Sequence, residues 1–189
     1  MRHSTASTPR ETLCGMEVAK LVLLCIAALC GFGAVLGEVS ALICPEAFTL
    51  GRPPVFEGWP ALALGPVWGV LDILLPATVA GLALAIAANV GHHPTLKAAF
   101  FHRVLPGLAG VMALAAVTAG ALGYFTTRGG SHEILGPMRD ALPLERHPRL
   151  AAVWWAALGS LSANFVGAIV LAMWTWRKRA HFGRLLARR

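Results

Sequence analysis

Four long apolar stretches constrain this chain more than any other feature of its sequence. They cover residues 19–43, 66–90, 104–125 and 150–176, and few Asp, Glu, Lys or Arg residues interrupt them. A helix that crosses a bilayer needs roughly 20 mostly apolar residues. Only 13% of the 189 residues are charged, whereas a soluble domain carries about 25%. The sequence therefore predicts an all-α protein, a bundle of four transmembrane helices that forms one integral membrane domain over residues 1–189.

The basic residues predict the orientation of the bundle, because Lys and Arg are enriched in cytoplasmic segments. With both termini in the cytoplasm, the cytoplasmic side holds most of the 16 basic residues. These are Arg2, Arg10, Lys20, Lys97, Arg103, Arg177, Lys178, Arg179, Arg184, Arg188 and Arg189. The outside loops hold Arg52, Arg128, Arg139, Arg146 and Arg149. From the compact size and the Ala-, Leu- and Arg-rich composition, we expect a bacterial plasma membrane.

Neither the first span nor the net charge of +7 changes this interpretation. The apolar stretch of the first span is longer than that of a typical secretory signal, so we expect it to be retained. The basic residues flank the apolar stretches, where they contact lipid headgroups, and this argues against nucleic acid as a partner. The two outside loops, residues 44–60 and 126–148, contain proline and apolar residues, and we expect both to fold over the helix ends.

A shift of the chain by 86 residues aligns the first two spans with the last two. Gly33 and Gly37 then match Ala119 and Gly123, and the pair Val67-Trp68 matches Val153-Trp154. Two tandem helical hairpins of this kind share one orientation, so the repeat is parallel and its symmetry axis runs along the membrane normal. Small residues spaced by four allow helix backbones to approach closely. We expect this spacing to pack helices within the chain rather than to form a dimer.

Glu38 and Asp72 are the ionisable residues that the sequence places within the hydrocarbon. Such residues are costly and are often functional. At 1.5 Å per residue, both would lie about 8 Å below the outer boundary of the membrane. Facing each other, the two carboxylates could bind a cation or share a proton. The alternative is that each meets water or a loop arginine, either Arg52 or Arg128, and the sequence slightly favours this alternative.

Three further polar residues are candidates for the interior of the bundle. Thr78 aligns with Asn164 in the repeat, and Thr118 lies in the middle of the third span. An amide near the bilayer centre should seek a hydrogen bond to another helix. We interpret Asn164 first as a packing contact and second as a ligand contact.

The positions of the seven histidines argue against a haem site inside the bundle, because none of them lies in the core of a span. His132, Glu133, Asp140 and His147 belong to the second outside loop, and they could join Glu38 and Asp72 at the outer mouth. These residue types suit a divalent metal or an acid–base pair. Their spacing follows no strong metal-binding motif.

Three functions remain open at this stage. The first, which the low polarity of the spans favours, is a structural or accessory component of a larger membrane complex. The second is an ion, proton or small-solute transporter that uses Glu38 and Asp72 and works as a homo-oligomer. The third is an enzyme that acts on a lipid-like or aromatic substrate at the outer surface, through a carboxylate–histidine site.

Overall fold

The computed structural model describes residues 9–53, 55–56, 58–90, 95–129 and 142–186, and of residues 9–14 and 186 it describes the backbone alone. Within these ranges the chain is all-α. The long helices are α1 (Pro9–Ile43), α3 (Ala61–Asn89), α4 (Leu105–Arg128) and α5 (His147–Leu186). The short elements are α2 (Glu46–Thr49) and the 3-10 helices η1 (Ala98–Arg103) and η3 (Leu144–Arg146).

The structure confirms the prediction of four helices that are long and apolar enough to cross a membrane. Among the described residues these segments are Gly15–Ile43, Ala61–Asn89, Ala98–Arg128 and Leu144–Leu185. The second starts earlier than predicted, because Pro60 precedes the helix and Pro66 is accommodated inside it. The fourth continues past residue 176, since a run of Arg, Lys and Ala suits a helix in water as well as in lipid.

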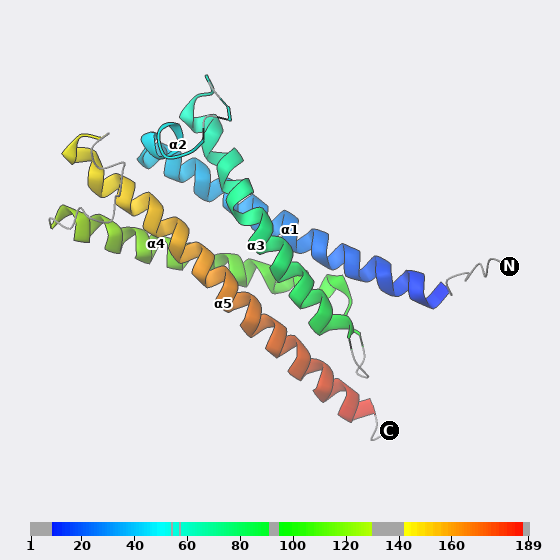
Figure 1. Ribbon diagram of the computed structural model, residues 1–189. Coiled ribbons are helices and arrows are strands. Elements are labelled where there is room, and N and C mark those ends of the chain that lie inside the picture. The colour runs from blue at the N-terminus through cyan, green and yellow to red at the C-terminus, as the bar shows by residue number, and fades with distance from the viewer. Residues whose placement is uncertain (1–8, 54, 57, 91–94, 130–141, 187–189) are drawn as a thin grey trace.

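The helices form two hairpins that lie side by side. α1 packs chiefly on α3, and α4 packs chiefly on α5, while α3 and α5 join the hairpins. Figure 1 shows α2 at the end opposite the two termini. We call the end with α2 and η3 the loop end, and the opposite end the termini end. α3 and α5 both run from the loop end to the termini end, so the hairpins are joined by a parallel helix pair.

Glycine brings α1 and α3 into backbone contact where they cross. A Cβ atom on Gly65 would lie 2.5 Å from the carbonyl oxygen of Gly37, and one on Gly37 would lie 2.7 Å from the carbonyl carbon of Gly65. Gly33 and Gly69 meet in the same way, backbone against backbone. No larger residue fits at these four positions without separating the helices. Such close approach maximises van der Waals contact between helices whose apolar surfaces gain nothing from leaving lipid.

The second hairpin repeats these contacts 86 residues later. Gly37 faces Gly65 in the first hairpin, and a Cβ atom on Gly123 would lie 2.8 Å from the carbonyl oxygen of Ala151 in the second. Gly33 meets the side chain of Ile73, and the equivalent position 119 is an alanine that meets Gly159. The offset that aligns the sequences therefore also aligns the contacts. In the second hairpin some of the small residues occupy other positions than in the first. The two crossings are therefore equivalent in geometry but are made by different small residues.

Enlarging Gly37 should separate the first hairpin. We expect Gly37→Ala to lower the free energy of unfolding by about 2 kcal/mol or more, because the new methyl group overlaps the Gly65 backbone. Gly31→Ala is the matched control, since a Cβ atom there meets nothing within 4 Å. Unfolding in mixed detergent micelles, followed by circular dichroism, measures both variants. Equal stability of the two variants would contradict this account of the crossing.

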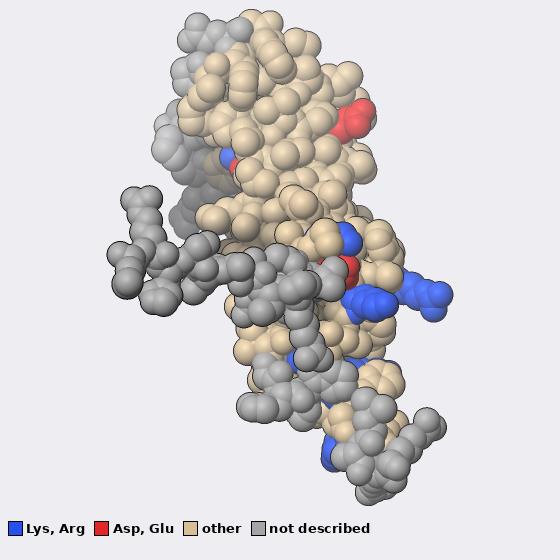
Figure 2. All heavy atoms as spheres, turned by 90° about the vertical axis from the view of Figure 1, so that its right-hand side faces the viewer, with Lys and Arg blue, Asp and Glu red and all other residues tan. Residues whose placement is uncertain are grey.

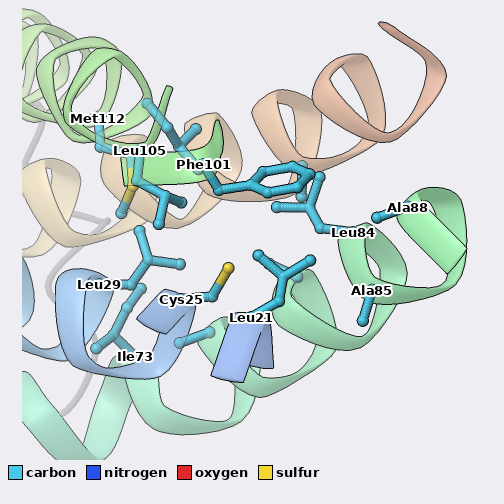
Figure 3. Packing of buried hydrophobic residues seen from close by; sticks show 14 residues of the cluster. Leu21, Cys25, Leu29, Ile73, Leu84, Ala85, Ala88, Phe101, Leu105 and Met112 are labelled. Carbon is cyan, nitrogen blue, oxygen red and sulfur yellow. The ribbon is translucent and has the colours of Figure 1, made fainter. Parts of the chain in front are cut away.

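An apolar core fills the termini-end half of the bundle. Figure 3 shows side chains from α1, α3, α4 and η1 that point toward one another. Leu21, Cys25 and Leu84 are at most 1% exposed, as are Phe101 and Met112. Among the described residues, this cluster fills the centre of the termini-end half with apolar side chains.

A buried arginine joins the two hairpins at the termini end. The Arg179 side chain of α5 is 1% exposed, and its Nη1 donates to the carbonyl oxygens of Ala87 (2.7 Å) and Val90 (2.8 Å). The last carbonyl groups of a helix have no partner within the helix, and they carry partial negative charge. Arg179 therefore satisfies the C-terminus of α3 with both hydrogen bonds and charge.

Loss of this cap should weaken the contact between hairpins. We expect Arg179→Met to cost about 2–4 kcal/mol of stability, because carbonyl groups of α3 lose charged donors while the aliphatic part of the side chain stays. Arg177→Met changes an exposed arginine two residues earlier and should cost less than about 0.5 kcal/mol. The same unfolding experiment compares them. A cost for Arg177→Met as large as that for Arg179→Met would show that charge alone, not the cap, matters.

Candidate functional site

A pocket lies in the loop-end half of the bundle, between the two hairpins. Residues of α1, α2, α3 and α5 line it, together with Arg52 from the connection after α2. Its cavity volume is about 70 Å³. A site needs roughly 10–15 Å³ of such volume to hold one water molecule, so this pocket has room for a few waters or a short apolar segment.

An ion pair forms the charged part of the pocket. Arg52 Nη1 donates to Asp72 Oδ1 at 2.8 Å, and Arg52 Nη2 donates to Asp72 Oδ2. The guanidinium also lies over the ring of Trp68, 5.0 Å from its centroid. The two side chains are 31% and 36% exposed. Arg52 thus anchors the first connection to α3 by a two-bond ion pair and a cation–π contact.

The rest of the pocket is apolar, with two buried hydroxyl groups. Ser40 of α1 is 7% exposed and Ser160 of α5 is 3% exposed. Ser160 donates to the carbonyl oxygen of Ala157 at 2.9 Å, so its hydrogen is used within its own helix. The apolar walls are made by side chains that include Phe32, Leu36, Phe48, Trp154 and Leu161. The pocket is therefore amphipathic, with charges on one part of the wall and hydrocarbon on the rest.

The first connection folds over the loop end, as the sequence predicts. Phe48 of α2 is 7% exposed and belongs to a buried cluster with residues from α1, α3 and α5. Glu46 of α2 pairs with Arg146 of η3 at 2.7 Å, which joins the two hairpins at the loop end. Beside it, burial raises the pKa of the Cys44 thiol to about 11. Most of the second loop, residues 130–141, lies outside the described residues.

The structure does not unite Glu38 and Asp72 in one site. Asp72 lines the pocket and pairs with Arg52, whereas Glu38 is exposed and is not among the pocket residues. The reason is helical periodicity. Gly37 faces α3, and Glu38, one residue further, points about 100° away around α1. Of the two arginines that the sequence offered as partners, Arg52 is the one that meets Asp72.

The two threonines use their hydroxyl groups within their own helices. Thr78 donates to the carbonyl oxygen of Leu74 at 2.8 Å, and Thr118 donates to that of Leu114 at 2.9 Å. Thr118 is exposed, so the described bundle does not place it in its interior. A hydroxyl that bonds to its own helix needs no partner on another one, and such a side chain can face lipid.

Asn164 does lie in the interior, and it is the least satisfied polar side chain there. It is 0% exposed, and neither Nδ2 nor Oδ1 has a hydrogen-bond partner among the described residues. It follows Ser160 by one helical turn, so it lies just beyond the pocket on α5. The interhelical hydrogen bond that the sequence suggested is not formed within the described part of the chain.

Removing this unsatisfied amide should stabilise the bundle. We expect Asn164→Leu to raise the free energy of unfolding by about 1–2 kcal/mol, because a buried amide without partners is replaced by a side chain of similar size. Asn89→Leu is the matched control. It removes an amide that does donate, to Ala85 at 2.9 Å, and should not stabilise. A clear loss of stability for Asn164→Leu would mean that this amide is hydrogen-bonded in the membrane.

The expected metal site falls mostly outside the described residues. His132, Glu133 and Asp140 belong to residues 130–141. His147 is 1% exposed, and its Nε2 lies 3.1 Å from the carbonyl oxygen of Leu142, so its ring holds the start of α5 against the preceding connection. Within the described ranges, no three side chains of His, Cys, Asp or Glu are grouped to hold a metal ion.

Sequence reasoning missed the polar contacts that join segments far apart in the chain. Arg179 stands in a basic run, and its burial is signalled only weakly by its helical spacing from Thr175, which is also buried. The Glu46–Arg146 pair has no signal in the sequence, because one hundred residues separate its members. No family model, curated protein or solved structure matches this chain.

Proposed function

We propose that this chain is a non-catalytic integral membrane protein that serves as an accessory component of a larger membrane complex. The observation that carries the proposal is the pairing of Asp72 with Arg52, away from Glu38. The transport alternative depends on a pair of Glu38 and Asp72, and the enzyme alternative depends on these acids together with loop histidines. Asp72 pairs with Arg52 and Glu38 lies outside the pocket, so the two carboxylates do not form such a pair in the described bundle.

The apolar core supports the same proposal. The pocket lies in the loop-end half, and the centre of the termini-end half is occupied by the apolar cluster around Leu21, Leu84 and Phe101. A transported ion would meet hydrocarbon there, at a cost of several kcal/mol without compensating ligands. This apolar cluster therefore favours the accessory role over ion transport.

The surface supports an accessory role in a membrane. Many large apolar side chains are exposed on all four long helices, among them Val35, Leu75, Val117 and Ile169. On the face in Figure 2 most of the described surface is uncharged, and most of the blue side chains gather in its lower half. Lipid or the apolar helices of a partner can cover such a surface, and water cannot do so favourably.

We place this protein in a bacterial plasma membrane with both termini in the cytoplasm. The basic residues Lys97, Arg103, Arg177, Lys178 and Arg184 all belong to the termini end, in agreement with the positive-inside rule. α5 has 40 residues, or about 60 Å of helix at 1.5 Å per residue, which is twice the thickness of the hydrocarbon. Its basic final turns therefore project toward anionic headgroups or an acidic surface of a partner.

Flux measurements separate the accessory role from transport. We expect liposomes with the purified protein to conduct protons, sodium and potassium no faster than empty liposomes. In mild detergent, the protein from native membranes should migrate in a larger assembly with fixed amounts of other polypeptides. Flux that Asp72→Asn abolishes and Glu46→Gln preserves would overturn the proposal, because it would assign transport to the pocket. Migration from native membranes as an isolated chain would overturn it as well.

A further inference from the structure

We propose that the pocket binds one phospholipid with a phosphoethanolamine headgroup. Its ammonium group faces Asp72, its phosphate faces Arg52, and a segment of one acyl chain enters the apolar part of the pocket. This inference concerns a binding site and does not depend on the accessory role.

The charges of the pocket select a headgroup that carries both signs. Arg52 and Asp72 lie side by side with no net charge, so an ion of one sign is attracted by one and repelled by the other. A zwitterion aligned against the pair meets attraction at both ends. Both side chains are about one third exposed, which leaves them accessible from the pocket.

The pair also retains unused hydrogen-bonding capacity. A guanidinium has five N–H donors, and the two bonds to Asp72 use two of them. A carboxylate has about four acceptor sites, of which Arg52 occupies two. A primary ammonium donates three hydrogen bonds and a phosphate accepts several, so both can be satisfied at once. A quaternary ammonium donates none, and phosphocholine should therefore bind less tightly than phosphoethanolamine.

The apolar walls fit the hydrocarbon part of a lipid. Phe32, Leu36 and Leu161 continue from the ion pair into the interface of the two hairpins. The volume of about 70 Å³ accommodates only a short chain segment. The remainder of the lipid would lie along the exposed apolar helices, as lipids do around any membrane protein.

A second hollow continues the pocket toward the loop end. It shares Phe48 and Arg52 with the first pocket and is lined also by Phe56, Trp59 and Trp68. Its volume is about 230 Å³. Tryptophan rings prefer the depth of the lipid headgroups. Arg52 therefore lies between the apolar pocket in the interior and the aromatic hollow at the level of the headgroups. A lipid requires this arrangement, because its chain and its headgroup need different surroundings.

The charged pair of this site is not repeated in the sequence of the second hairpin. The positions equivalent to Arg52 and Asp72 in the second hairpin are Met138 and Leu158, and neither carries charge. Apolar surface that binds lipid without selectivity is present on both hairpins. The charged pair that would select a headgroup belongs to the first hairpin.

Native mass spectrometry of the full-length protein in detergent tests the proposal. Phosphatidylethanolamine, phosphatidylcholine and phosphatidylglycerol with identical acyl chains are titrated separately. We expect one phosphatidylethanolamine per chain, bound roughly tenfold or more tightly than either other lipid, the effect of about one charge-assisted hydrogen bond. Equal binding of the three lipids overturns the proposal. Preference for phosphatidylglycerol also overturns it, because the site would then recognise a net negative charge.

Variants separate the headgroup contact from the fold. Asp72→Asn should reduce the preference for phosphatidylethanolamine over phosphatidylcholine to less than about twofold, since the ammonium loses its anionic partner. Glu46→Gln is the matched control, because it breaks an ion pair of the same end that lines neither hollow. It should retain the preference. If Asp72→Asn does not fold, the double variant Arg52→Gln with Asp72→Asn removes both charges together and leaves neither unpaired, and it should also lose the preference. An undiminished preference in the folded variant overturns the proposal.

A larger side chain in the pocket wall tests the contact between the pocket and the acyl chain. Ala157→Leu adds side-chain volume to the pocket wall and should lower the affinity for phosphatidylethanolamine about tenfold. Ala113→Leu makes the same change on the exposed face of α4 and should leave affinity unchanged. Glycerophosphoethanolamine, which has the headgroup without chains, should compete only at much higher concentration. Competition at the same concentration as the lipid would overturn the role of the apolar walls.

Discussion

Contact between the backbones of α1 and α3 at Gly33, Gly37, Gly65 and Gly69 is the interaction on which the rest of this structure depends. Apolar side chains do not bring helices together in lipid, because lipid is as apolar as they are. Close van der Waals contact does, and it requires two small surfaces at one crossing. The crossing fixes which faces of α1 and α3 turn inward. It thereby places Ser40 and Asp72 beside the pocket and leaves Glu38 outside it.

Helix number, the two hairpins and the repeat could be predicted from the sequence, because they depend on length, hydropathy and spacing along one chain. The partner of Asp72 could be narrowed to two arginines for the same reason, since loop residues reach only nearby helix ends. The side of α1 on which Glu38 lies could not be predicted. It depends on the crossing, and the crossing depends on four glycines in two helices whose register is set in three dimensions. The role of Arg179 could not be predicted, because the carbonyl oxygens that accept its hydrogen bonds lie some ninety residues away in the chain.

The two hairpins have equivalent helix crossings, but the residues that flank the crossings differ. In the first, the crossing is flanked by Asp72 and Arg52, and in the second the equivalent positions are Leu158 and Met138. Asn164 shows the reverse, because it is fully buried in the second hairpin whereas its equivalent, Thr78, is satisfied by its own helix. The two hairpins therefore carry different polar groups at equivalent positions, and the parallel pair of α3 and α5 brings both hairpins to the same central interface.

Arg179 has a consequence for the order in which this protein assembles. Its acceptors, the last carbonyl groups of α3, are complete once the first hairpin is made, but the arginine itself emerges from the ribosome only after α4 and most of α5. Domains and hairpins that are made first generally fold first. Until Arg179 arrives, the C-terminus of α3 must be satisfied by water or headgroups, which holds that end of the first hairpin near the membrane surface. The Arg179 cap of α3 can be completed only when α5 is in place, so this contact between the two hairpins requires most of the chain to have been made.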